Sequence, residues 1–140
     1  MFSWLKRFFT RGAADPAGAA GERAASDFLQ RERGFAIIAR NWRSPRDRRD
    51  EIDLVCRDGE VLVFVEVKTR AAHALVQGYE AITMRKKKVL RRACTAYLRA
   101  LGALQPRTFR FDVVEVAPHA GGASEVRHFE NVPLFPKNFG

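Results

Sequence analysis

Apolar and polar residues alternate most regularly between positions 51 and 68 of the chain. Two such runs, 51–56 and 61–68, flank a polar segment that contains Asp58 and Gly59. Asp-Gly between two apolar runs is typical of a β-hairpin, because its two-residue turn needs positive φ angles that these residues tolerate. The pattern therefore predicts two antiparallel strands joined by a turn at Asp58-Gly59.

The position of the turn sets the register of this hairpin. Arg57 pairs with Glu60 beside the turn, and further out Asp53 lies opposite Phe64 and diagonally from Glu66. Because side chains alternate between the faces of a strand, one face is wholly apolar and the other receives every charge of the open end. The charged face carries Glu51, Asp53, Val55, Leu62, Phe64, Glu66 and Lys68, and the apolar face carries Ile52, Leu54, Cys56, Val61, Val63, Val65 and Val67.

Two other segments have the apolar spacing of amphipathic helices. The first covers about 19–33 and ends at Gly34, and the second runs from a Thr83 cap to about Leu101. Short apolar runs predict further strands, and polar runs predict loops between them. The expected strands are 35–39, 109–116 and a weak 125–129, and the expected loops are 41–50 and 71–81. The order helix, three strands, helix, strand predicts an α/β fold.

A chain of 140 residues is long enough for one domain and short for two. We expect a flexible tail and linker at 1–18, the folded domain at 19–132 and a short tail at 133–140. Residues 1–11 mix aromatic and basic side chains and could form a short helix on a membrane surface. A tail that packs weakly on the domain is the favoured alternative, and no segment has the length of a membrane span.

The net charge is +9, from 25 basic and 16 acidic residues. A composition of 46% apolar residues excludes a disordered polycation, so the charge indicates a folded domain with a polyanionic partner. Nucleic acid and an anionic membrane are both compatible with it. Cys56 and Cys94 lie in apolar runs, which favours buried, reduced thiols in a cytoplasmic protein, and the histidines lack zinc-ligand spacing.

The charges that end the apolar strand carry the candidate chemistry. Glu66 and Lys68 follow a run of apolar residues, and a buried carboxylate is costly unless it is paired or bound to a metal. Asp53 and Glu66 would repel each other unless a divalent cation lay between them, and such oxygen ligands suit magnesium. Lys68 could orient a water or stabilise charge on a phosphate oxygen. The alternative interpretation is an ion pair at the sheet rim, with Glu51 and Asp53 merely solvated.

Several segments together form a recognisable set. They are Gly21-Glu22, Asn41-Trp42-Arg43, Glu51-Ile52-Asp53-Leu54, Val63–Arg70 and Arg110–Val114. The set resembles the bacterial YraN family, also called UPF0102, over about residues 21–131. The resemblance implies a restriction-endonuclease-like α-β-β-β-α-β core, with a mixed sheet flanked by helices, in the neighbourhood of archaeal Holliday junction resolvases.

The resemblance also implies a site. Asp53 and Glu66 would bind Mg²⁺, or Mn²⁺, with Lys68 as a catalytic residue and Glu22 of the first helix completing the constellation. Asp50 departs from the family pattern, which usually has glycine there, and an added carboxylate could alter the approach of metal or phosphate. Relatives in the superfamily are often dimers, so a homodimer is possible, and some bind nucleic acid without cutting it.

Basic residues are concentrated before the strand of Asp53 and at the start of the second helix, where six of the eight residues 85–92 are basic. Their mutual repulsion is tolerable on a surface that follows a phosphate backbone. Thr69 and Arg70, just past Lys68, could reach a scissile phosphate. The nucleic-acid-binding candidates are Arg43, Arg46, Arg48, Arg49, Thr69, Arg70, Arg85, Lys86, Lys87, Lys88, Arg91 and Arg92.

Three hypotheses follow. The first is a magnesium-dependent nuclease that hydrolyses phosphodiesters in DNA, plausibly branched or otherwise structured DNA. The second is a nucleic-acid-binding module that keeps the fold with little or no catalysis. The third is a protein that associates with a membrane surface through residues 1–11.

Overall fold

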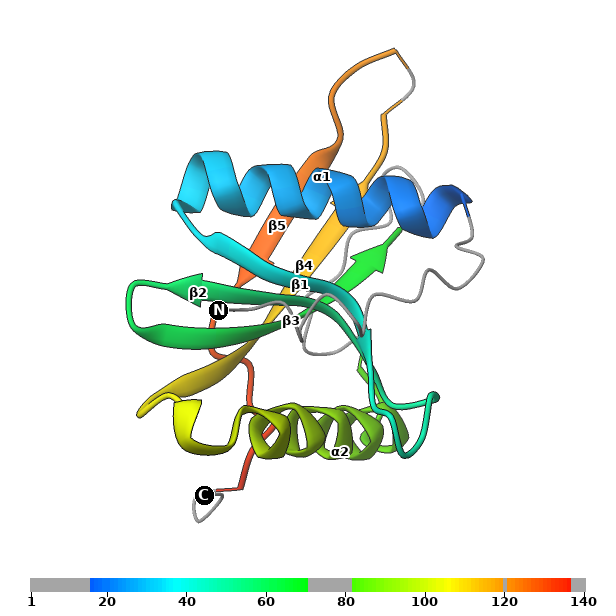
Figure 1. Cartoon of the computed structure of the whole chain (residues 1–140). Helices are drawn as coiled ribbons and strands as arrows, with labels where there is room; N and C mark the ends of the chain where they lie inside the picture. The colour runs from blue at the N-terminus through cyan, green and yellow to red at the C-terminus, as the bar shows by residue number, and fades with distance from the viewer. Residues whose placement is uncertain (1–15, 71–81, 120, 137–140) are drawn as a thin grey trace.

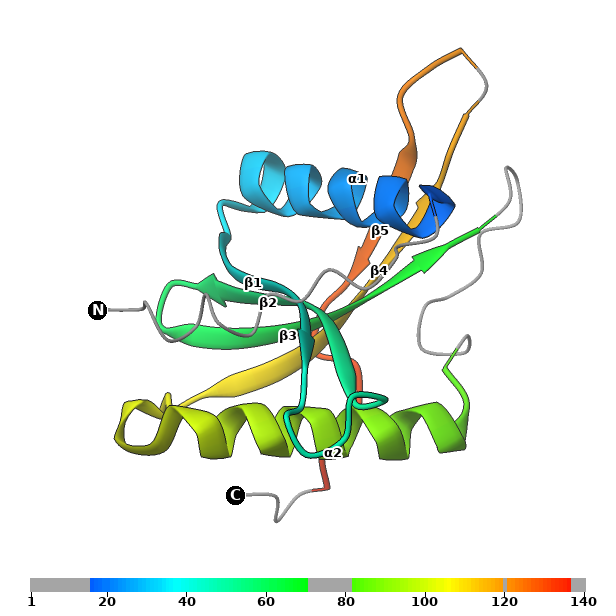
Figure 2. The same cartoon turned by 45° about the vertical axis from the view of Figure 1, so that its right-hand side comes forward.

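The computed structural model describes residues 16–70, 82–119 and 121–136. In these residues a five-stranded sheet carries one long helix on each face, as Figure 1 and the turned view in Figure 2 show. The elements are α1 (Pro16–Arg33), β1 (Ala36–Arg43), β2 (Glu51–Asp58), β3 (Val61–Thr69), α2 (Met84–Leu101), the short 3₁₀ helix η3 (Gly102–Leu104), β4 (Phe109–Ala117) and β5 (Glu125–Phe129). The α-β-β-β-α-β order is confirmed, and β5 is the possible last strand.

The strands lie in the order β1-β2-β3-β4-β5. β3 and β4 are parallel, whereas the other neighbours are antiparallel, so the sheet is mixed. A parallel pair needs a crossover connection, and α2 lies in that connection. The mixed sheet implied by the family resemblance is therefore present.

Both helices end at glycine in a backbone conformation that other residues resist. Gly34 has a φ angle of 69° after α1, and Gly102 has a φ angle of 53° after α2. α2 begins as predicted, because the Thr83 hydroxyl accepts a 3.1 Å hydrogen bond from the Lys86 N–H. α1 begins at Pro16, earlier than the apolar spacing indicates, because proline is favoured in a first helical turn.

The predicted turn of the β2–β3 hairpin was wrong by one position. Asp58 pairs with Val61, so the turn residues are Gly59 and Glu60. Gly59 has a φ angle of 59° and Glu60 has no positive φ, which fits a turn with glycine at its first central position rather than the Asp-Gly type. Because each partner moves by two residues, the alternation of faces is unchanged.

β1 is longer than predicted and continues through Arg43, where the sequence pattern placed a loop from residue 41. Asn41 interrupts the regular alternation with a φ angle of 51°, a conformation that asparagine tolerates. This interruption helps to place Trp42 on the α2 side of the sheet, where its ring packs edge-on against Tyr97 with 5.2 Å between the ring centroids. The polar composition of residues 41–43 concealed this part of the strand.

The sheet separates two hydrophobic cores. On the α2 side, Phe64 packs with Tyr97 at a ring distance of 5.8 Å. The α1-side core contains Leu54, Cys56, Val63 and Val65 of the hairpin together with Ala25 and Leu29 of the helix. Ile52 departs from the predicted face and joins the α2-side core beside Trp42, its β1 partner. Cys56 and Cys94 are buried and form no disulfide.

The N-terminal ends of both helices lie near the same end of the strands, which is the C-terminal end of β3 (Figure 1, Figure 2). Gly21 of α1 lies against Thr69, and a Cβ added at Gly21 would overlap the Thr69 Oγ1 atom. Glycine therefore permits the close approach that brings the next residue, Glu22, to the end of β3. We call this side of the sheet the open end, and the side of the Gly59-Glu60 turn the hairpin end.

No helix in the part of the chain that the structure describes is long and apolar enough to span a membrane. The tail of residues 1–11, with its predicted membrane association, most of the predicted linker and the 71–81 loop lie outside the described residues.

Candidate metal and nucleic-acid site

β2 and β3 separate at the open end, and Asp53 lies at the point of separation. The last ladder pair joins Leu54 and Val65. Beyond it, the Val67 N–H donates a 2.8 Å hydrogen bond to the Asp53 carboxylate. If the ladder register is continued by one residue, Asp53 lies opposite Glu66. The sequence register had placed the two acids diagonally from each other, so they are nearer than predicted.

Glu66 is nearly buried, with 5% of its surface exposed. Two lysines approach the same oxygen: Lys68 Nζ lies 3.6 Å and Lys86 Nζ lies 3.7 Å from Glu66 Oε1. Burial and the nearby Glu66 charge raise the pKa of the Cys94 thiol, which places the carboxylate on the α2 side. Glu66 is thus a buried anion flanked by cations from two elements.

Asp53 lies in a site that disfavours its ionised form. Burial raises its pKa well above the ordinary value of 3.8, and the charge of Glu66 raises it further. Glu22 and Glu51 act in the same direction, and the Val67 N–H opposes them. The fold therefore brings together negative charges that its own donors compensate only in part.

Glu22 reaches this site from the first part of α1. Burial raises the pKa of Glu22, and the charges of Glu51 and Glu66 add to the effect, while a hydrogen bond with the Asn41 side chain opposes it. The unusual φ angle of Asn41 and its contact with Glu22 belong to one local arrangement of β1 and α1. The sequence pattern singled out Asn41 only as part of the family resemblance and missed this partner of Glu22.

Glu51 and Asp50 have basic partners of their own. Glu51 forms an ion pair with Arg43, with 3.5 Å between Oε2 and Nη2. Asp50 is almost buried and accepts two hydrogen bonds from Arg92 of α2, at 2.9 and 3.3 Å. The unusual acid at position 50 therefore ties the preceding loop to α2.

The predicted nucleic-acid-binding residues differ in their partners and in their exposure. Five of them have partners within the fold: Arg43 with Glu51, Arg49 with Asp47, Lys86 with Glu66, Arg91 with the Leu134 carbonyl and Arg92 with Asp50. Several members, engaged or not, expose their side chains, namely Arg46, Arg48, Arg49, Thr69, Arg85, Lys88 and Arg92, whereas Arg70 and Lys87 are partly exposed. Of the α2 cations, Lys86 lies beside Glu66, and the other exposed or partly exposed basic residues lie on the 44–50 loop, at the end of β3 and along α2.

Asp53 and Glu66 are the candidate ligands for a divalent cation. Among the described residues, no three acid, histidine or cysteine side chains form a cluster able to hold a metal. Mg²⁺ commonly uses one or two carboxylates and completes its coordination with water and phosphate. Asp53 and Glu66, two oxygen donors whose negative charge is incompletely balanced, fit that requirement.

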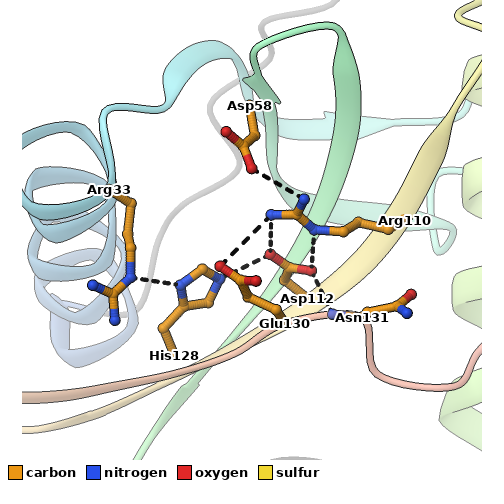
Figure 3. A network of polar contacts seen from close by, with 7 residues as sticks. All are labelled: Arg33, Asp58, Arg110, Asp112, His128, Glu130 and Asn131. Atoms are coloured by element: carbon orange, nitrogen blue, oxygen red, sulfur yellow. Dashed lines mark hydrogen bonds and ion pairs between the residues drawn. The ribbon is translucent and has the colours of Figure 1, made fainter.

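A second group of polar residues centres on Asp112 of β4 and reaches the β2–β3 hairpin through Arg110 and Asp58 (Figure 3). Asp112 of β4 is fully buried and accepts hydrogen bonds from both Arg110 and the Asn131 N–H. His128 Nε2 lies 2.8 Å from the same carboxylate, and Arg33 donates to His128 Nδ1. Burial alone would raise the pKa of Asp112, but these hydrogen bonds lower it below the ordinary value. Asp112 is thus a structural partner of Arg110 and His128.

Glu115 is a buried acid that the sequence analysis missed. It has no exposed surface, and the β3–β4 ladder places it beside Lys68. Its position in an apolar strand is a signal of the same kind as that of Glu66, so the alternation of β4 could have identified it.

Comparison with known proteins gives a consistent result. The family described as "Uncharacterised protein family UPF0102" matches residues 21–116. A UPF0102 protein of Symbiobacterium thermophilum is 47% identical over 114 residues, which cover 81% of this chain and 92% of the relative. A UPF0102 protein of Beutenbergia cavernae is 45% identical over 120 residues, covering 86% and 98% of the two chains. The matched segment contains Glu22, Asp53, Glu66, Lys68 and Lys86.

Proposed function

The chain belongs to the UPF0102 family, and from that premise we propose that it is a magnesium-dependent nuclease that hydrolyses phosphodiester bonds in DNA. The observation that carries the proposal is the pair of neighbouring acids at the open end. Glu66 is almost buried, and its charge helps to raise the pKa of Asp53. A divalent cation would relieve this repulsion, which the neighbouring lysines do only in part.

Asp53 and Glu66 would hold Mg²⁺ or Mn²⁺. The bound ion would supply positive charge to a phosphate oxygen and favour deprotonation of water. Lys68, whose Nζ lies 3.6 Å from Glu66 Oε1, would orient the attacking water or stabilise the developing phosphate charge. Glu22, whose raised pKa makes it a stronger base than an ordinary glutamate, would accept the proton of that water. One P–O bond forms with the water oxygen, and the P–O bond to the leaving strand breaks. The oxygen of the leaving strand then takes a proton.

The exposed basic residues of the 44–50 loop and of α2 would hold the phosphate backbone beside these acids. Backbone contacts position nucleic acid without reading bases, so we expect little sequence preference. Branched or otherwise structured DNA is the substrate that the resemblance to junction resolvases suggests. A homodimer would allow two strands to be addressed together.

The test is cleavage of linear, single-stranded and four-way-junction DNA with Mg²⁺, with Mn²⁺ and with EDTA. We expect cleavage that needs a divalent cation and that falls at least about 100-fold in Glu66→Gln, because a neutral amide replaces the negatively charged oxygen ligand. Glu60→Gln is a matched control, since Glu60 is exposed at the hairpin turn on the opposite side of the sheet. Its cleavage rate should equal that of the wild type.

A different outcome would identify the alternative function. If the wild type cuts none of these substrates above the Glu66→Gln background while it still binds them, the enzyme proposal fails. The protein would then be a nucleic-acid-binding module with a nuclease-like site. Gel-shift measurements on the same substrates distinguish that result from an absence of binding.

A further inference from the structure

Two lysines contact one carboxylate oxygen at the open end, and they come from elements of different character. Lys68 belongs to β3, two residues from Glu66, and the ladder places it beside buried Glu115 of β4. Lys86 belongs to the first turn of α2, and 38% of its side-chain surface is exposed. The Lys68 backbone is held in the β3–β4 ladder and 27% of its side-chain surface is exposed, so Lys86 is the more exposed of the two and lies outside the sheet.

A divalent cation at Glu66 would be repelled by both ammonium groups. Within the described residues, Glu66 is the carboxylate that lies within ion-pair distance of Lys86. Lys68, in contrast, has Glu115 as a ladder neighbour as well as Glu66. The less costly movement is therefore that of Lys86, which can swing toward solvent.

We propose that Lys86 exchanges partners: it pairs with Glu66 in the metal-free protein and moves to a DNA phosphate when Glu66 takes a divalent cation. This inference rests on the proposed nuclease function and adds a coupling between metal and DNA at the same site. Lys86 thereby lowers the affinity for metal in the absence of DNA. In the presence of DNA it adds a phosphate contact and the competition ends.

The substitution Lys86→Met is a clean probe, because the Thr83 cap depends on the backbone N–H of residue 86 and not on its side chain. Arg99→Met is a matched control that removes one positive charge from the last turn of the same helix. Lys86→Arg keeps the charge and should behave as the wild type. Circular dichroism establishes that all variants are folded.

The measurements are calorimetric titration with Mn²⁺ and DNA binding at several salt concentrations. We expect Lys86→Met to bind Mn²⁺ roughly fivefold more tightly than the wild type without DNA, since the competing ion pair is gone. In the presence of metal, its salt dependence of DNA binding should decrease by about one phosphate contact. Arg99→Met should change neither quantity.

Equal Mn²⁺ affinity in Lys86→Met and wild type, with affinity abolished in Glu66→Gln, would overturn the exchange and leave the proposed function standing. Weaker Mn²⁺ binding in Lys86→Met would also overturn it, because the lysine would then support the metal site. If neither the wild type nor Lys86→Met binds Mn²⁺, the exchange and the proposed function fail together.

Discussion

The acids of two regions of the sheet are treated in opposite ways. In the middle of β4, Asp112 is fully buried, yet donors from Arg110, His128 and the Asn131 backbone lower its pKa. At the open end, burial and a neighbouring carboxylate raise the pKa of Asp53. The first arrangement stabilises the fold, because the protein supplies the compensating donors. The second leaves charge for something outside the protein to compensate, which is typical of a functional site.

The largest effect on stability should come from removing Asp112, the acid whose charge the fold itself compensates. Asp112→Ala leaves Arg110 and His128 without their shared acceptor, and we expect a loss of about 3–5 kcal/mol in the free energy of unfolding. Urea titration measures this change. Asp58→Ala removes a partly exposed partner of the same Arg110 and should cost less than about 1 kcal/mol. Similar losses in the two variants would contradict the distinction between buried and exposed members of the network.

The next largest effect on stability concerns the close approach of α1 to the end of β3. Gly21→Ala places a Cβ against the Thr69 hydroxyl, and overpacking of this kind costs about 1–3 kcal/mol. Thr69→Ala removes the overlapping oxygen, so the double variant should recover most of the stability of Thr69→Ala. Urea titration of the wild type, both single variants and the double variant measures the coupling. Additive losses would show that Gly21 is needed for another reason.

Much of this comparison was accessible from the sequence, because the one-position error in the turn moves each cross-strand partner by two residues and so leaves the faces unchanged. The turn was misplaced by one residue, yet Leu54 and Val63 still share the α1-side core, and Phe64 still packs on Tyr97. Glu66 was identified because it follows an apolar run, and Asp53 because the hairpin register puts it on the same face as Glu66. A turn type depends on backbone angles that the Asp-Gly dipeptide favours but does not impose. The position of the turn was therefore predicted less accurately than the sorting of residues onto the two faces.

The remaining features depend on contacts between distant segments, which one-dimensional patterns do not contain. Lys86 and Glu66 are twenty positions apart, and the contact follows from where α2 begins. The pairing of Asp50 with Arg92 likewise requires the 44–50 loop to lie against α2. Ile52 changes core because β2 leaves β3 beyond Leu54, where the Asp53 side chain takes the Val67 N–H.

The smallest predicted effect concerns Asp53 itself and has a definite sign. Because folding raises the pKa of Asp53, its ionised form destabilises the folded state above that raised pKa. This penalty disappears as the pH falls through the raised pKa toward the ordinary value of 3.8. Asp53→Asn keeps an acceptor for Val67 and loses the charge, so it should melt at a higher temperature than the wild type at about pH 8, with the difference closing near pH 4. Asp112→Asn should show the reverse order at about pH 8, since its stabilising charge is fully present there.

The most direct test of the open end is the melting temperature of wild type and Asp53→Asn at about pH 8, with and without about 10 mM Mg²⁺. If Asp53 and Glu66 share a divalent cation, Mg²⁺ should raise the melting temperature of the wild type by about 4 °C at tenfold excess over the dissociation constant. Asp53→Asn should begin higher and fail to respond to Mg²⁺. A variant that begins lower than the wild type, or that gains as much from Mg²⁺, would contradict the view that the acids of the open end await a cation.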